Sequence, residues 1–336
     1  MKLEFKKGSK YSRKDIGWVC YPDKGRPAGG DWDTGYVRVE DNLIIFMNIG
    51  VPGTTEHDFD NHYDHSKGVI VWYGKPKSHS QQPTFQKLLS GEIEVVDCTG
   101  VLGPDTPILQ LPPDFAKNTP KVEIHKISEY DEDGPFFAWN WMVLGEHTGT
   151  HFDAPHHWIT GKDYEDGYTD TLSVQRLVAP VNVIDCSEES ASDADFLLTA
   201  DHIKSWESEN GAINKGEWVV MRTDWDKRSH NQDLFLNADE TGPHSPGPTV
   251  DCLEYLLSKD IVGWGSQCIG TDAGQAGGMD PPFPAHNLLH KNNCFGLASL
   301  ANLDKLPAKG AILIAAPLKI ERGTGSPIRA LALVPK

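Results

Sequence analysis

The 336-residue sequence lacks the features of membrane and secreted proteins. It has no run of about eighteen apolar residues, so no transmembrane helix is expected. Its first residues, MKLEFKKGSKYSRKD, lack the apolar core of a secretory signal. No two of its six cysteines form a Cys-x-x-Cys pair, which favours reduced, buried thiols over a disulfide framework. We therefore expect a cytoplasmic protein that does not enter a membrane.

Basic residues are scarce, and the imbalance is uneven along the chain. The formal net charge is −17, with 31 Lys and Arg against 48 Asp and Glu. Residues 1–91 contribute 13 basic and 11 acidic side chains, so the rest of the chain holds 18 and 37. A surface that acidic repels a phosphate backbone, which argues against nucleic-acid binding by residues 92–336. The near-neutral residues 1–91 carry no such restriction.

The step in charge coincides with a change in the secondary-structure pattern. Residues 34–50 and 68–75 are rich in β-branched and aromatic side chains and are bounded by Gly, Pro and Asp, which is typical of strands. Residues 83–92 have the pattern of a short helix. We expect a small β-rich domain of unknown function over residues 1–91 and a second domain over residues 92–336.

The second segment alternates apolar runs with helical patterns, which favours an α/β domain. Residues 249–260 place their leucines on one helical face, and Thr199 and Gly211 bound a capped helix. The acidic residues 125–133 are expected to form a solvated loop. Apolar, strand-like runs occur at residues 181–187, 217–225, 261–267 and 311–320.

The densest group of ligand-type side chains is HTGTHFDAPHHW, which starts at His147. In an extended strand alternate side chains share a face, so His147, His151 and Asp153 would point the same way. Gly149 would leave room between them. Pro155 would end the strand, because proline cannot donate to a ladder.

Two imidazoles and a carboxylate on one face suit Zn or Mn, and three protein ligands leave a position open for water. A neutral histidine at the turn that holds His156 and His157 would take a proton from that water. The alternative is a polar loop with surface histidines. Three donors on one face, with a further histidine at the turn, favour the metal site.

The same residues resemble a known signature. HTGTHFDAPHH is similar to the pattern H-x-G-T-H-x-D-A-P-x-H of the metal-dependent cyclase family, the family of bacterial kynurenine formamidase, isatin hydrolase and trans-dienelactone hydrolase. The similarity covers about residues 93–336. Outside the motif it is carried by DCTGVLGPDTPILQLPP (97–113), GTDAGQAGGMDPPFPAHNLLH (270–290) and LASLANLDKLP (297–307).

The resemblance implies a role for each matching residue. His147, His151 and Asp153 match the metal ligands of the family. His157, the last histidine of the motif, matches its general base or proton shuttle. His286 matches a C-terminal site histidine that either binds a second metal or contacts the substrate.

The resemblance also implies a metal count, a fold and a reaction. In kynurenine formamidase a glutamate ligates the second metal, whereas this chain has Ala298 and Ser299 there, so we expect one divalent ion. The implied fold is an α/β swivelling β/α/β domain that usually forms a homodimer. The implied reaction is hydrolysis of a carbon–nitrogen or carbon–oxygen acyl bond, in which the metal polarises water and carbonyl while a histidine relays the proton.

Further side chains are candidates for a substrate pocket. Phe137, Trp139 and Trp141 come just before the ligand stretch and would wall a pocket for a flat ring, or else pack in the core. Asp272 and Gln275 stand in a glycine-rich segment. They would orient a site histidine, or simply form the turn.

Together these patterns predict a metal-dependent hydrolase with one Zn or Mn ion. Its substrate would be a small, possibly aromatic, molecule with an amide, formamide, cyclic imide or lactone bond. The alternative is a non-catalytic binding or sensor protein on the same fold, whose N-terminal unit binds a nucleic-acid or nucleotide-like partner.

Overall fold

The chain divides into two compact units, residues 1–87 and residues 88–336. The sequence pattern places that division four residues later, after residue 91. The computed structural model describes residues 36–40, 43–49, 61–64, 69–74, 84–111 and 116–336.

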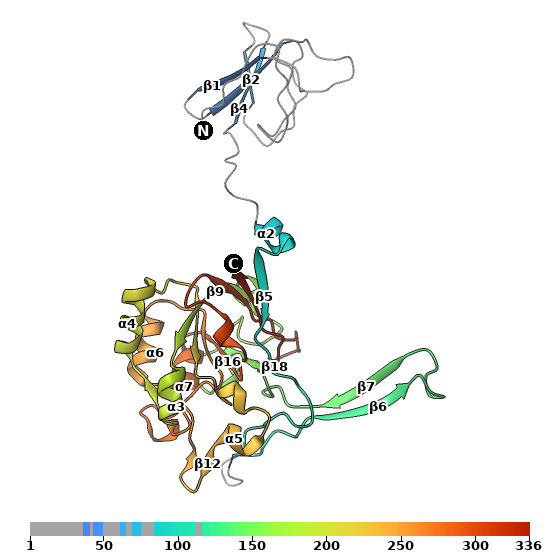
Figure 1. The fold of residues 1–336 in the computed structure, drawn as a ribbon, viewed down its shortest axis with the longest axis vertical. Helices are drawn as coiled ribbons and strands as arrows, with labels where there is room; N and C mark the ends of the chain where they lie inside the picture. The colour runs from blue at the N-terminus through green and yellow to red at the C-terminus, as the bar shows by residue number, and fades with distance from the viewer. Residues whose placement is uncertain (1–35, 41–42, 50–60, 65–68, 75–83, 112–115) are drawn as a thin grey trace. The chain divides into compact units, whose positions relative to one another are not determined.

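The described part of the first unit is a four-stranded antiparallel sheet with the order β1-β2-β4-β3 (Figure 1). This agrees with the β-rich character that its sequence predicts. The strand-like run over residues 34–50 contains two strands, which pair with each other. The bounds are Tyr36–Glu40 for β1, Leu43–Ile49 for β2, Asn61–Asp64 for β3 and Val69–Gly74 for β4.

The second unit is built on a nine-stranded mixed sheet with the order β18-β8-β16-β15-β11-β9-β17-β19-β5. The central strands β16, β15, β11 and β9 are parallel, and helices connect them because parallel neighbours need a crossover. The outer pairs are antiparallel. The bounds are Ile93–Asp97 (β5), His151–Asp153 (β8), Val178–Asp185 (β9), Trp218–Arg222 (β11), Gly263–Ser266 (β15), Phe295–Ala298 (β16), Ala311–Ile314 (β17), Gly325–Pro327 (β18) and Leu331–Pro335 (β19).

Helices α4 and α6 lie where the sequence predicts them. Thr199 caps the start of α4 by accepting the backbone N–H of His202, and Gly211 ends it with a φ of +85° that glycine adopts without strain. The α-helices are Thr84–Ser90 (α2), Ser187–Ser192 (α3), Ala200–Asn210 (α4), Gln232–Leu236 (α5), Val250–Leu257 (α6) and Pro284–Lys291 (α7). The 3-10 helices are Pro155–His157 (η1), Val174–Leu177 (η2), Trp225–Arg228 (η3), Ala276–Gly278 (η4) and Leu303–Lys305 (η5). Two-residue strands are Leu197–Leu198 (β10), Ala238–Asp239 (β12), Gly242–Pro243 (β13) and Gly247–Pro248 (β14).

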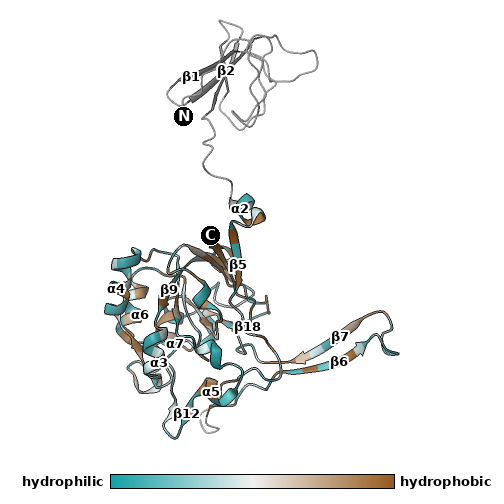
Figure 2. Cartoon of the chain, viewed as in Figure 1, coloured by the Kyte–Doolittle hydropathy of each residue, from teal (hydrophilic) through white to brown (hydrophobic). Residues whose placement is uncertain are grey.

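Strand β11 supplies side chains to two cores because alternate residues point to opposite faces. Trp218 and Val220 belong to one hydrophobic cluster, which also contains Phe152 of β8. Val219 and Met221 belong to the other, which packs under α4, α6 and α7. Figure 2 shows the hydropathy of these elements, with β9 largely hydrophobic and α4 largely hydrophilic. Phe152 therefore anchors β8 in the first of these clusters, while His151 and Asp153 lie on its other face.

A long two-stranded arm extends from this body (Figure 1). Strands β6 (Glu123–Glu129) and β7 (Ala138–Val143) pair only with each other, with one irregularity between Lys126 and Ser128. The expected solvated loop at residues 125–133 is therefore wrong over most of its length. His125, Ile127 and Glu129 stand at alternate positions there, and together with the aromatic strand that follows they give a β-hairpin pattern.

The described cysteines are free and buried, as the sequence predicts: Cys98, Cys186, Cys252, Cys268 and Cys294. Cys20 lies outside the described residues. Among the described residues, no helix is long and apolar enough to span a lipid bilayer.

Candidate metal centre

The ligand stretch is a bend and not the extended segment that the alternation of its side chains predicts. Only His151–Asp153 form a strand, and Gly149 turns the chain with a φ of +60°. The strand ends before Pro155, where η1 begins. The prediction of one continuous strand from His147 is therefore wrong. The bend at Gly149 nevertheless returns His147 to the same side as the strand.

Three donors converge at this bend. One donor atom each from His147, His151 and Asp153 lies within 4.8 Å of the others. Nδ1 of His147 is 2.7 Å from Oδ1 of Asp153, and Nε2 of His151 is 3.4 Å from the same oxygen. Asp153 is 1% exposed and His151 is 6% exposed. The group is thus a buried cluster and not a set of surface histidines.

Hydrogen bonds on the outer side of each imidazole determine which nitrogen carries the proton. Nδ1 of His151 lies 2.7 Å from the carbonyl oxygen of Gly149, which can only accept. Nε2 of His147 lies 3.1 Å from the Thr324 hydroxyl, whose own proton is donated to the Glu146 carboxylate at 2.7 Å. In the neutral imidazoles both outer nitrogens are therefore donors and both inner nitrogens carry a lone pair, so that a proton or a metal ion on the inner side is what pairs the Asp153 carboxylate.

Two lone pairs aimed at one carboxylate oxygen repel it unless a cation lies among them. The donor set fits a divalent ion on this ground, since ligating histidines donate their outer N–H to a protein acceptor. Burial raises the pKa of Asp153, but its interactions with His151 and His147 lower it more, so that the pKa lies well below its usual value. The carboxylate is ionised and can act as a ligand.

Glycines on both neighbouring strands make room for the cluster. Gly296 of β16 and Gly325 of β18 are each paired with Asp153. A Cβ at Gly296 would lie 2.7 Å from Oδ2 of Asp153, and a Cβ at Gly325 would lie 2.3 Å from Cε1 of His147. Any side chain at either position would displace a donor.

His157 lies against the donors in a stack. Its ring centroid is 3.7 Å from that of His147, with 27° between the planes. Burial places the pKa of His157 well below its usual value; Asp153 opposes this shift, while His147 and His286 add to it. A neutral imidazole in this position can accept a proton.

Helix α7 brings His286 to the same place. Its Nδ1 lies 2.5 Å from Asp272, which also accepts the backbone N–H of Ala285 at 2.6 Å and so holds the start of the helix. Burial lowers the pKa of His286, but the hydrogen bond to Asp272 and its charge raise it more. Asp153, His157 and His286 form a second trio of donor atoms within 4.8 Å. Asp153 is common to both trios, and the count of one ion stays a prediction.

Four of the candidate pocket residues lie elsewhere. Phe137, Trp139 and Trp141 are on the arm, where 47%, 54% and 51% of each residue is exposed. Gln275 is exposed, and its amide donates to the carbonyl of Pro243 at 3.0 Å. The structure brings Asp272, but none of these four, next to the histidines.

Other residues at the site have no place in the sequence interpretation. Glu146 directly precedes His147, so its carboxylate could have been recognised from the sequence as a candidate partner of the site. Thr324 is 177 residues from His147 and gave none. His290 follows His286 by one helical turn, which places both on one face of α7.

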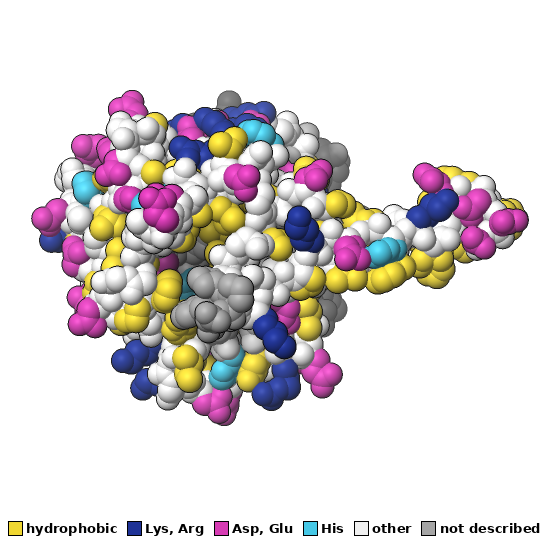
Figure 3. Space-filling view, turned by 90° about the horizontal axis from the view of Figure 1, so that it is seen from below, with side chains coloured by type: hydrophobic (Ala, Val, Ile, Leu, Met, Phe, Trp, Pro, Cys, Tyr) yellow, Lys and Arg dark blue, Asp and Glu magenta, His cyan; other side chains and the backbone are white. Residues whose placement is uncertain are grey.

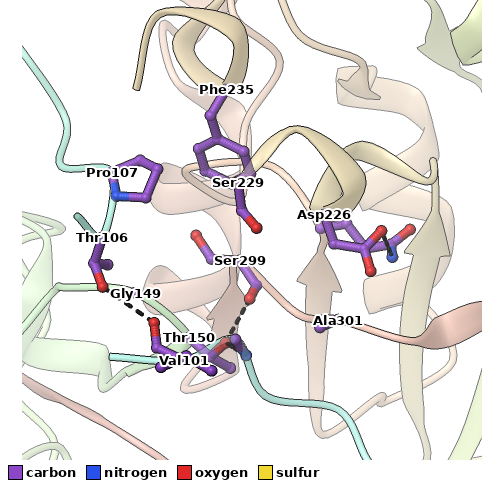
Figure 4. A pocket seen from close by; sticks show the side chains of 12 residues that line it. Val101, Thr106, Pro107, Gly149, Thr150, Asp226, Ser229, Phe235, Ser299 and Ala301 are labelled. Carbon is purple, nitrogen blue, oxygen red and sulfur yellow. Dashed lines mark hydrogen bonds between the residues drawn. The ribbon is translucent and has the colours of Figure 1, made fainter. Parts of the chain in front are cut away.

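A cavity with a mixed lining lies behind the ligand bend; its polar side chains include Thr150, Ser299 and Asp226 (Figure 4). The Thr150 hydroxyl donates to the carbonyl of Ser299 at 2.6 Å and accepts the backbone N–H of Gly100 at 2.9 Å. Burial raises the pKa of Asp226, whose Oδ1 accepts the Gln267 amide at 2.8 Å. The bend that carries the ligands is therefore fixed from its outer side.

Comparison with known proteins agrees with this geometry. A family model described as "Putative cyclase" matches residues 88–273. Isatin hydrolase of Roseibium aggregatum is 88% identical over 250 residues, which are 74% of this chain and 95% of that protein. A solved isatin hydrolase bound to the product analogue thioisatinate superposes with a TM-score of 0.74 at 87% identity, over 75% of this chain and 96% of that one. Kynurenine formamidase of Bacillus cereus strain ZK is 29% identical over 191 residues, 56% of this chain and 77% of that protein.

The chain belongs to the cyclase family. Its α/β fold with a curled sheet is that of the family, and it is a metal-dependent hydrolase. These findings favour the enzyme over the non-catalytic binding or sensor protein.

Removing the shared carboxylate should empty the centre. Asp153→Ala takes away the one charged ligand and leaves two imidazoles, so we expect its metal content to fall to background while the native protein keeps a constant ratio. Elemental analysis after dialysis measures this ratio. Asp201→Ala, an exposed aspartate on α4, is the matched control and should keep its metal. Native stoichiometry in Asp153→Ala would contradict the assignment.

Acid should weaken the fold through a buried histidine. The pKa of His290 is lowered to about 4, chiefly by burial and then by His286, whereas an unfolded histidine titrates near 6.5. Between about pH 7 and pH 5 the unfolded chain therefore gains a proton that the folded chain does not, and stability falls as pH falls. His290→Asn lacks this imidazole. Between pH 7 and pH 5 its free energy of unfolding should therefore fall by about 2 kcal/mol less than that of the native protein. Denaturant titrations of both metal-free proteins measure this, and equal losses would refute it.

Proposed function

We propose that this enzyme hydrolyses isatin and opens the lactam ring of that aromatic compound to isatinate. The observation that carries the proposal is the buried cluster of His147, His151 and Asp153. It lies in a chain that is 88% identical to an isatin hydrolase over 95% of the length of that protein. Isatin is a flat cyclic amide, which agrees with the class of bond that the site predicts. The proposed setting is the cytoplasm, since buried free thiols persist in a reducing compartment.

One Zn or Mn ion is proposed, held by His147, His151 and Asp153. Imidazole and carboxylate donors suit both ions, and three protein ligands leave room for further ligands. When bound, the ion would supply Lewis-acid polarisation of a carbonyl and a lowered pKa for coordinated water. The chain supplies the rest: Thr324 and Gly149 hold the tautomers of the two histidines, so that their inner nitrogens stay available.

His157 is proposed to accept the proton that hydrolysis releases. It is neutral, it stacks on a ligand, and one of its nitrogens faces the trio that it forms with Asp153 and His286. His286 is held in place by Asp272 and lies on the other side of that trio, where it can contact the substrate or the developing product. Both histidines come from short helices, η1 and α7, so they keep their geometry without the substrate.

A homodimer is proposed in addition, built with the arm. A two-stranded hairpin is marginally stable alone in water, and this one exposes large apolar side chains along its length (Figure 3). Trp139 and Trp141 alternate along β7 and therefore share one face, and Phe137 directly precedes the strand. A second copy would cover that face, and the aromatic rings could then reach the substrate of the partner. Residues 1–87 lie outside the matched family region and contain neither the ligand residues nor the arm. A nucleic-acid partner for these residues belongs only to the alternative function that the sequence left open.

Turnover tests the activity and the role of His157 together. The native protein should hydrolyse isatin faster than formylkynurenine or a dienelactone. His157→Ala should keep its metal while its kcat falls roughly 100- to 10,000-fold, because general acid–base groups contribute that much. His156→Ala is the neighbouring control, since His156 bonds the carbonyl of Tyr164 away from the donors. Loss of metal from His157→Ala would make it a ligand, and no turnover of isatin by the native protein would overturn the substrate.

The arm is tested by one charged substitution. Trp139→Asp puts a carboxylate on the aromatic face, so sedimentation velocity should show a monomer where the native protein is a dimer. Val174→Asp changes an exposed apolar residue on η2, away from the arm, and should stay dimeric. A native monomer, or a dimeric Trp139→Asp variant, would rule this interface out.

A further inference from the structure

His290 is a buried histidine beside the site to which the proposed reaction assigns no role. It is 0% exposed and lies in α7, one turn after His286. Its Nδ1 is 3.2 Å from the carbonyl oxygen of Cys294, just beyond the helix. Because a carbonyl only accepts, Nδ1 carries the proton and Nε2 carries a lone pair.

That lone pair is unsatisfied. Nε2 of His290 is buried and has no hydrogen-bond partner within the described structure. Buried polar atoms in native proteins are nearly always paired, so an orphan next to a reactive site calls for a partner. The ring of His290 lies 5.9 Å between centroids from those of His157 and His286, at 83° and 68°.

The two neighbours differ in their hydrogen bonds. Nδ1 of His286 already donates to Asp272, which holds that ring from its other side. The ring nitrogens of His157 have no hydrogen-bond partner among the described residues, and an imidazole always carries at least one N–H. His157 is therefore the ring whose donor matches the free acceptor of His290.

We propose that His290 is a positioning residue that accepts the N–H of His157, directly or through one water molecule. This contact would fix a single tautomer of His157. Its remaining nitrogen would then be the acceptor that faces Asp153 and His286, within 4.8 Å of both. The inference deepens the proposed function, because it explains how a histidine without protein hydrogen bonds keeps its lone pair toward the reaction.

A purely structural role is the alternative, in which His290 only closes the end of α7 through Cys294. Two substitutions separate the roles, because each replaces one ring nitrogen with an amide. His290→Asn keeps a donor near the position of Nδ1 and removes the group at Nε2. His290→Gln keeps a polar atom near the position of Nε2 and loses the bond to Cys294.

Positioning predicts that activity and stability respond to different variants. His290→Asn should keep its metal and melting temperature while kcat falls about 10- to 100-fold at unchanged KM, as for other groups that orient a site histidine. His290→Gln should melt earlier but keep kcat within a few-fold of the native value. Native kcat in His290→Asn would overturn the proposal.

A second measurement uses the native protein alone. It tests the contact even if the variants do not fold or the native protein does not cleave isatin. Long-range ¹H–¹⁵N spectra of the zinc-loaded native protein, with labelled histidine, report the tautomer of each ring. One neutral tautomer at His157, with an acceptor shift at Nε2 of His290, supports the contact whatever the substrate is. A mixture of tautomers at His157 in the native protein would refute it.

Discussion

The site depends on one electrostatic constraint, the burial of an ionised carboxylate. Asp153 lies between two strands at 1% exposure, and its pKa is held well below its usual value. A buried charge is costly unless it is paired, and two inward histidine lone pairs do not pair it. The neighbouring strands are compatible with this requirement, because Gly296 and Gly325 make room for the cluster.

The chemistry of the site was predictable because its ligands are local in sequence. His147, His151 and Asp153 lie within seven residues, so any conformation that turns the chain back brings them together. The reason given for their convergence was nevertheless wrong, since a turn at Gly149 does what a longer strand was expected to do. The α/β elements were predictable for a similar reason. Apolar runs such as that of β11 need only their own residues to indicate burial.

What the sequence could not indicate depends on contacts between distant residues. Thr324 fixes a ligand tautomer from 177 residues away, and nothing in its neighbourhood marks it. Glycines at 296 and 325 matter only because the strand register sets both against Asp153. The aromatic run before the motif suggested a pocket by its nearness in sequence, but it forms an arm, since a β-hairpin carries consecutive residues away from the body. Nearness along the chain predicts contact only where the chain turns.

The ligand cluster by itself does not account for substrate choice. A kynurenine formamidase shares 29% identity over 191 residues with this chain, and its name records a different substrate from that of the isatin hydrolase. The His147–His157 stretch is too small to define a pocket, because its side chains are committed to the ion, to each other and to the strand. Selection must therefore come from surfaces around it. In the homodimer proposed above, the exposed rings of the arm would be one such surface. A rigid sheet holds the donors in place, so the arm can vary its side chains without disturbing the ligands.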